Sequence, residues 1–213
     1  IAFQESGVET LPVVAVMAAA SGGVLSLLAA QQLEKLGAPA LAPKLIGIAI
    51  LGELGALITG IAVAGRVASA FAAEIAARRA AGTAAPLDIE TFDTLVMPRI
   101  LALVVAGPLL VTYANSAAIV GGTAVAAGLL GSTVRQHFDG MMSALTIAQG
   151  TAGLVKGAVF GLVSALAGCY YGLHAETGPA GIGRAVRRAV VFAVVAVAVA
   201  DVTLTFVLKW VPL

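Results

Sequence analysis

The sequence predicts an all-α membrane protein with about five transmembrane helices. Of its 213 residues, 60% are hydrophobic and only 11% are charged, whereas a soluble domain carries about 25% charged residues. The mean hydropathy is +1.04, and the apolar runs are continuous, unlike the alternating strands of a transmembrane β-barrel. This composition excludes a soluble enzyme and a disordered chain. The net charge of +1 also argues against binding to nucleic acid.

Five apolar stretches are long enough to cross about 30 Å of hydrocarbon. Each should be a helix, because lipid offers no partner for backbone N–H and C=O groups. They cover about residues 8–31, 45–71, 100–127, 150–173 and 189–210. The first stretch follows Glu5 and Glu9 rather than basic residues, so it is not predicted to be a cleaved signal peptide. We expect residues 1–213 to form a single membrane domain.

Basic residues near the ends of these helices favour one orientation in the membrane. The loops after the second and fourth helices are flanked by six arginines, and the opposite side holds three basic residues. These are Arg78, Arg79, Arg99, Arg184, Arg187 and Arg188 against Lys35, Lys44 and Arg135. Because cytoplasmic loops are richer in Lys and Arg, we expect a cytoplasmic N-terminus and a C-terminus on the outer side.

The segment after the second helix predicts a cytoplasmic elbow. The helical pattern continues to about residue 81, and Gly82 and Pro86 then interrupt it before a short polar helix start. Charged residues recur along the elbow at Glu74, Arg78, Arg79, Asp88, Glu90 and Asp93. We interpret them as a docking surface for a partner protein, and a merely solvated helix face is the alternative.

Two further patterns concern packing. Between the third and fourth helices, Phe138, Met141, Met142 and Leu145 are spaced near i, i+3, i+4 and i+7, which predicts a short amphipathic helix at the outer interface. In the fourth helix, four glycines share one face: Gly157, Gly161, Gly168 and Gly172. Small residues at this spacing let helices approach closely, either within one chain or across a dimer.

Motifs for nucleotide, metal or nucleophile chemistry are absent from the sequence. It contains no G-x-x-x-x-G-K-[ST] and no G-x-S-x-G. His137 and His174 are isolated and lack metal-ligand spacing. We therefore expect that the chain is not an enzyme and binds no cofactor of its own.

Four polar residues fall inside predicted membrane helices. Glu53, Lys156, Asp201 and Asn115 lie within a few ångströms of one depth at about 1.5 Å per residue. A charge in hydrocarbon costs about 2.5–3.5 kcal/mol on insertion scales, so such groups normally face a partner or a wet cavity. They form either a polar wall of a transport cavity or an ion pair of Lys156 with Glu53 or Asp201. Gly52 and Gly55 bracket Glu53 and should open the backbone beside it.

A series of short motifs runs in order along nearly the whole chain. They are Glu53-Leu54-Gly55, Ala64-Gly65-Arg66, Tyr113-Ala114-Asn115, Gly153-Leu154-Val155-Lys156, Gly168-Cys169-Tyr170 and Ala200-Asp201. In this order and spacing they resemble the MlaE/YrbE family of ABC-transporter permeases, which work with MCE proteins. Ala56 stands where that family usually has proline, and the elbow is shorter than usual.

The resemblance implies a homodimer in the bacterial inner membrane, with its C-terminus in the periplasm. Two ABC ATPase subunits, which would bind ATP and Mg, would lie below it and a hexameric MCE-domain protein above it. The complex would move phospholipid or another lipid between the inner and outer envelope. The elbow would act as a coupling helix, and an interfacial helix is expected before residue 1.

The resemblance also implies a lipid cavity between the two protomers, lined by the first two transmembrane helices. We expect its lining to include Leu25, Leu28, Ala29, Gln32, Glu53, Leu54 and Leu57. The apolar side chains would hold acyl chains, and Glu53 would lie near the headgroup or govern gating. One alternative is a proton-coupled secondary transporter or channel that uses Glu53 and Asp201 as relays. Another is a structural membrane anchor.

Overall fold

The computed structural model describes residues 10–81, 92–129 and 131–210. Helices make up nearly all of this part of the chain, which contains no β-strand. The elements are α2 (Leu11–Lys35), the 3₁₀ turn η2 (Pro39–Leu41), α3 (Ala42–Ala49), the π-helical turn η3 (Ile50–Leu54), α4 (Gly55–Ala80), the π-helical turn η4 (Phe92–Val96), α6 (Met97–Leu129), α7 (Val134–Met142), α8 (Ile147–Leu173) and α9 (Pro179–Trp210).

Five helical segments in the described residues are long and apolar enough to cross a membrane, as predicted. They are Leu11–Lys35, Pro39–Ala80, Thr94–Leu129, Ile147–Leu173 and Pro179–Leu208. Each of them extends beyond its predicted membrane stretch at one end or both, and the second and the last extend furthest. The second continues to Ala80, as the helical pattern after residue 71 predicts, because the residues there are mostly alanine and arginine, which favour helix. The last begins at Pro179 rather than near residue 189, because proline is favoured in the first helical turn.

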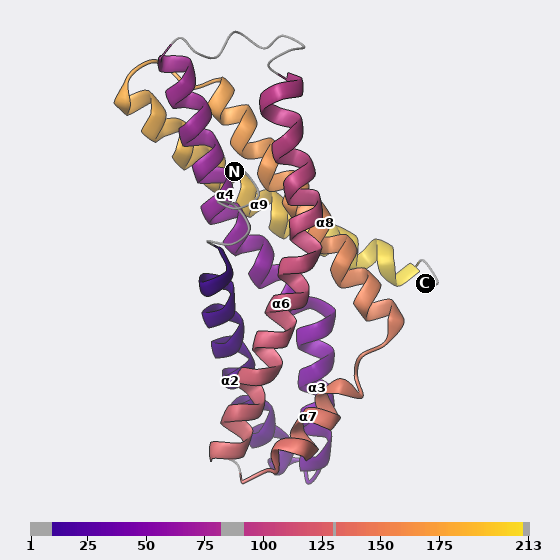
Figure 1. Cartoon of the computed structure of the whole chain (residues 1–213). Coiled ribbons are helices and arrows are strands. Elements are labelled where there is room, and N and C mark those ends of the chain that lie inside the picture. The colour runs from indigo at the N-terminus through magenta and orange to yellow at the C-terminus, as the bar shows by residue number, and fades with distance from the viewer. Residues whose placement is uncertain (1–9, 82–91, 130, 211–213) are drawn as a thin grey trace.

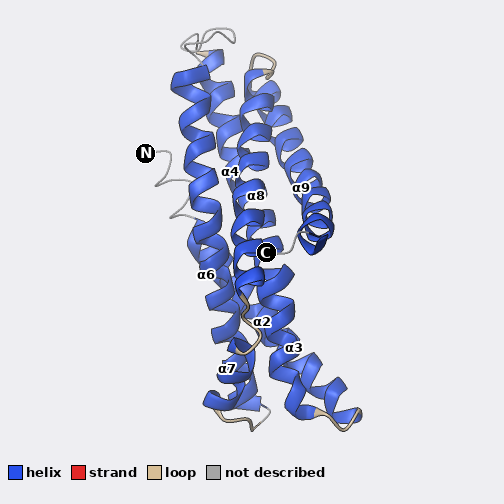
Figure 2. Ribbon diagram, turned by 90° about the vertical axis from the view of Figure 1, so that its right-hand side faces the viewer, coloured by secondary structure: helices blue, strands red, loops and turns tan. Residues whose placement is uncertain are grey.

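The helices form an elongated bundle with α4 and α8 packed against each other at its centre (Figure 1). On either side of this pair, α6 packs against α8, and α9 packs against both α4 and α8. Figure 2 shows α9 running beside α8. Along α6 lies α2. The C-terminal end of α4 and the N-terminal end of α6 mark one end of the bundle, the α4–α6 end, and α7 marks the opposite end, the α7 end (Figure 1).

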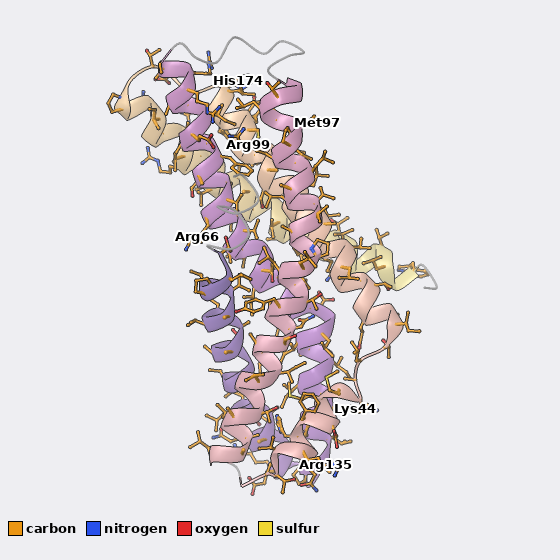
Figure 3. All side chains as sticks on the ribbon, viewed as in Figure 1. Lys44, Arg66, Met97, Arg99, Arg135 and His174 are labelled. Atoms are coloured by element: carbon orange, nitrogen blue, oxygen red, sulfur yellow. The ribbon has the colours of Figure 1, made fainter. Side chains whose placement is uncertain are left out.

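Basic residues separate between these two ends in the way that the sequence predicts. Arg99 lies toward the α4–α6 end, whereas Lys44 and Arg135 lie at the α7 end (Figure 3). Arg78 and Arg79 belong to the last turn of α4. The assignment of the α4–α6 end to the cytoplasm stays a prediction.

Glycines allow α2 and α6 to touch backbone to backbone. A Cβ atom at Gly121 of α6 would lie 2.2 Å from the Ala19 carbonyl oxygen of α2. A Cβ atom at Gly22 of α2 would lie 2.0 Å from the Ala118 carbonyl oxygen of α6. Any side chain at either position would therefore separate the two helices, as expected for membrane helices that associate through small residues.

The glycine face of α8 serves packing within the chain, which is one of the two predicted alternatives. A Cβ atom at Gly161 would lie 2.2 Å from the Leu103 carbonyl oxygen of α6, and one at Gly168 would lie 2.9 Å from the Ala68 carbonyl oxygen of α4. The glycine face of α8 thus packs against α6 along the first half of α8 and against α4 along the second half of α8.

The predicted amphipathic helix is α7, but it ends at Met142, so Leu145 lies in the connection to α8 rather than on the helix. Thr133 caps its N-terminus by accepting a hydrogen bond from the Gln136 N–H, and Thr146 and Gln149 then form a capping box at the start of α8. Met141 is buried, and its carbonyl oxygen would lie 2.4 Å from a Cβ atom at Gly47 of α3. The helix therefore packs one face against α3 and leaves only part of its apolar surface exposed.

Candidate functional site

The second span contains a π-helical turn, η3, which includes Glu53. Gly55 begins α4 directly after this turn, and a Cβ atom at Gly55 would lie 1.7 Å from Asn115 Oδ1 of α6. Space around Gly52 is open. Single π-turns inside α-helices occur frequently at functional sites. The backbone beside Glu53 is predicted to open, and in the structure it does so by forming this wider π-helical turn.

Glu53 joins side chains of α8 and α9 in one polar cluster. Lys156 Nζ forms an ion pair with Glu53 Oε2 and lies 3.0 Å from Asp201 Oδ1. It also donates a hydrogen bond to Thr205 Oγ1 at 2.8 Å. Thr205 Oγ1 lies 3.1 Å from Glu53 Oε2 and 2.8 Å from the Asp201 carbonyl oxygen. We call these four residues the Lys156 cluster.

Burial differs among the members of the Lys156 cluster. The side chain of Lys156 is 1% exposed and that of Asp201 12%, but that of Glu53 is 44% exposed. One ammonium group lies between two carboxylates, so the ionised cluster carries one net negative charge. Because a buried charge needs a close partner, Lys156 and Asp201 act as an interhelical ion pair. Glu53 is the carboxylate that remains accessible to a ligand or to water.

The structure brings together three of the four polar residues that the sequence places at one depth. Asn115 is the fourth, and it lies against Gly55 rather than in the Lys156 cluster. Its Oδ1 is buried without a hydrogen-bond partner in the described structure. Sequence analysis missed Thr205, although it lies four residues after Asp201 and therefore on the same helical face.

The residues predicted to line a lipid cavity lie on α2, η3 and α4. They are Leu25, Leu28, Ala29, Gln32, Glu53, Leu54 and Leu57. On α2, Leu28 and Gln32 are exposed and the other two are half-buried. Leu54 and Leu57 are also half-buried. One chain alone leaves these side chains partly uncovered, and their role in lipid binding stays a prediction.

At the α4–α6 end, charged side chains connect the end of α4 with the start of α6. Arg99 Nη2 lies 2.6 Å from Glu74 Oε2, and Arg78 Nη2 lies 2.6 Å from Glu74 Oε1. Arg99 also donates to the Leu95 carbonyl oxygen and lies over the ring of Phe71 at 5.3 Å. The sequence predicts Arg99 to flank a loop, but the structure buries it between the two helices.

The other residues of the predicted docking surface are described only in part. Arg79 is exposed at the end of α4. Asp88 and Glu90 lie outside the described residues, and Asp93 is described by its backbone alone. The Arg99–Glu74 ion pair joins the two helices on either side of the predicted elbow, whereas the Arg78–Glu74 pair lies within α4.

Comparison with known proteins identifies the family. The family model described as "Permease MlaE" matches residues 2–207. The chain belongs to the MlaE permease family. This MlaE-family permease is 30% identical over 202 residues to a protein of Rickettsia felis named "Probable ABC transporter permease protein", with 93% of the chain and 78% of the relative covered.

Two more distant relatives come from photosynthetic organisms. A probable ABC transporter permease protein of Synechocystis is 27% identical to the MlaE-family permease over 207 residues, which is 96% of the chain and 77% of the relative. The chloroplastic protein TRIGALACTOSYLDIACYLGLYCEROL 1 of Arabidopsis thaliana is 28% identical over 163 residues, covering 75% of the chain and 47% of the relative. The chain is therefore an ABC transporter permease, as its short motifs predict.

A buried histidine connects α7 of the MlaE-family permease with its first span. His137 is 3% exposed, and its Nε2 lies 3.3 Å from Ser26 Oγ of α2. Burial lowers the pKa of His137 below its usual value of 6.5, because the charged imidazolium is poorly solvated there. The neutral ring is thus the form that fits between the helices.

We expect the permease to lose stability in acid through His137. His137 takes up a proton less readily in the folded state than in the unfolded state. The free energy of unfolding therefore does not depend on His137 above pH 6.5 and falls as the pH drops below 6.5. Thermal unfolding in detergent between pH 8 and pH 5 measures this effect. His137→Gln should reduce the dependence, and His174→Gln, at an exposed histidine, should preserve it. An unchanged dependence in His137→Gln would contradict the assignment.

Proposed function

We propose that this permease is the membrane subunit of an ATP-driven lipid transporter of the bacterial inner membrane. In this proposal two copies assemble with two ABC ATPase subunits and a hexameric MCE-domain protein. Membership of a family of ABC permeases supports the ATPase partners. The name of the Arabidopsis relative contains that of a galactolipid, which supports a lipid substrate.

The observation that carries the proposal is the half-exposed Glu53 at a π-turn of a membrane helix, beside the half-buried Leu54 and Leu57. Apolar side chains next to one accessible carboxylate suit a ligand with acyl chains and a polar headgroup. In the most apolar windows of α2 and α9, only 28% and 17% of residues are buried within the chain. Their free faces are available to a second copy and to lipid.

The mechanism follows from the continuity of α4. This helix has 26 residues and is therefore about 39 Å long. It joins the Glu74 ion pairs at one end to the turn beside Glu53 at the other. A ligand that binds equally well to both states of a permease does not change the equilibrium between them. ATP binding by the partners must therefore move α4 so that the cavity loses affinity for lipid and expels the chains.

Substitution of Glu53 tests the role of the accessible carboxylate. Glu53→Gln should reduce ATP-dependent lipid transfer while the fold survives, because Lys156 keeps Asp201 as a partner. Glu53→Lys should abolish transfer, because it places a second cation beside Lys156. Lipid transfer between vesicles, with fluorescent phospholipid and the complete complex, measures both effects.

A matched control for these variants is Glu176→Gln. Glu176 is also exposed and ion-paired, with Arg184, but it lies in the loop before α9. This variant should transfer lipid at the wild-type rate. Unchanged transfer in both Glu53 variants would remove Glu53 from the site.

A second candidate function is proton-coupled transport through Glu53 and Asp201. Both carboxylates contact Lys156, so a proton on one would change the charge balance of the other. This alternative predicts flux that follows a pH gradient without any ATPase. ATP dependence of transport separates the two functions.

A further inference from the structure

A cavity of about 370 Å³ lies between η3, α6, α7 and α8. Most of its lining is apolar, and none of its described lining residues is charged. The larger apolar side chains include Leu51, Ile119, Val120, Phe138, Leu145 and Leu154. Figure 1 shows α8 diverging from α6 toward its N-terminal end, above α7. The cavity borders η3 through Leu51, but none of the seven residues predicted to line the transport cavity lines this one, so the two are separate.

The mouth of the cavity belongs to the lipid-facing surface. Val120 is 67% exposed, and Phe138, Leu145 and Leu154 are each exposed as well. The neighbouring α6 side chains Leu109 and Val105 continue this exposed apolar surface. Because α6 and α8 both span the membrane, the molecules nearest to the mouth are the acyl chains of the bilayer.

The volume of the cavity limits which apolar molecules can occupy it. Its 370 Å³ holds about a dozen groups of the size of water or methylene, at roughly 30 Å³ each. Two turns of a partner helix, about 10 Å wide and about 11 Å long, would need roughly twice this volume. One hydrocarbon chain fits inside the cavity, whereas a helix could insert only the side chains of one face.

The polar residues of the wall are compatible with an apolar occupant. The Thr112 hydroxyl donates to the Pro108 carbonyl oxygen at 3.0 Å, and the Ser116 hydroxyl donates to the Thr112 carbonyl oxygen at 2.9 Å. Their donors are therefore satisfied within α6. Asn115 turns its buried Oδ1 toward Gly55. Among its described residues, the cavity wall therefore has no charged group that a ligand would have to neutralise.

We propose that this cavity binds one acyl chain of a bilayer lipid, whose second chain remains in the membrane. The bound chain fills the space between α7 and the diverging end of α8 and so stabilises both. This site is not the site of transport. A variant that loses the bound chain is therefore expected to transfer lipid as before, which separates failure of this proposal from failure of the proposed function.

The test uses the full chain in vesicles of phosphatidylethanolamine and phosphatidylglycerol, with a small fraction of phosphatidylglycerol that carries a diazirine on one acyl chain. After illumination, mass spectrometry locates the crosslinked residues. Crosslinks should concentrate on residues 111–120 and 150–154 and exceed those on the exposed face of α9. Gly150→Phe should abolish them, because Gly150 lines the cavity and has open space at its Cβ position.

Gly128→Phe is the matched control, since Gly128 of α6 also has open space at its Cβ position and does not line the cavity. It should leave the crosslinks unchanged. If Gly150→Phe does not fold, Ser116→Phe on the exposed wall of the cavity replaces it. Crosslinks that persist in the filled variant, or that do not exceed those on α9, would overturn the proposal.

Discussion

Lys156→Met is expected to destabilise the permease by roughly 3–5 kcal/mol, the range found when one partner of a buried ion pair is removed. Lys156 is fully buried and is the cation that contacts both Glu53 and Asp201. Without it, the largely buried carboxylate of Asp201 would lose its cation and remain near the carboxylate of Glu53. The ion pairs that join α8 to η3 and α9 would be lost, and the carboxylates of η3 and α9 would repel each other. Thermal unfolding of the purified chain in lipid nanodiscs measures the loss.

Two further variants decide whether charge is the cause. The triple variant Glu53→Gln, Lys156→Met and Asp201→Asn removes all three charges, and it should recover most of the lost stability because no unpaired charge remains. Arg135→Met breaks the exposed pair with Asp139 and should cost less than about 1 kcal/mol. If the triple variant is as unstable as Lys156→Met, packing rather than charge accounts for the effect.

Gly121→Leu should prevent α2 from docking on α6. Even a Cβ atom at this position would lie 2.2 Å from the Ala19 carbonyl oxygen, so the helices must separate along their contact. The cost should exceed the 1–3 kcal/mol that is typical of overpacking, because backbone atoms cannot move aside as side chains do. Since α2 carries four of the predicted cavity residues, transport should be lost as well.

Gly128→Leu provides the control for this prediction. Gly128 lies seven residues further along α6, on nearly the same helical face, but its Cβ position is open. We expect wild-type thermal stability and transport for this variant. A folded, active Gly121→Leu protein would contradict the close contact between α2 and α6.

The fold and the centre of the site could be predicted because membrane helices obey few rules. Long apolar runs must be helical in lipid, and a fixed rise per residue places Glu53, Lys156 and Asp201 at one depth. Which of them pair could not be predicted, because rotation of each helix about its axis depends on packing. Thr205 was missed because a threonine in a membrane helix usually bonds within its own helix.

The error at the α4–α6 end concerns Arg99 and has a different cause. The continuation of α4 to Ala80 was predicted from the helical pattern past residue 71, because alanine and arginine favour helix in water as well. Arg99 follows Pro98 and has the pattern of a loop boundary. Its burial depends on Phe71 and Glu74, which are distant in sequence. Contacts of this kind leave no periodic signal.

The proposed function requires that this permease moves lipid with energy from a partner ATPase. The most direct measurement reconstitutes the complete complex in vesicles that contain fluorescent phospholipid. It follows lipid movement with ATP, without ATP, and with a pH gradient alone. We predict movement with ATP and none with the gradient alone. Lipid movement that follows the pH gradient without nucleotide, or movement that ATP leaves unchanged, would contradict the claim.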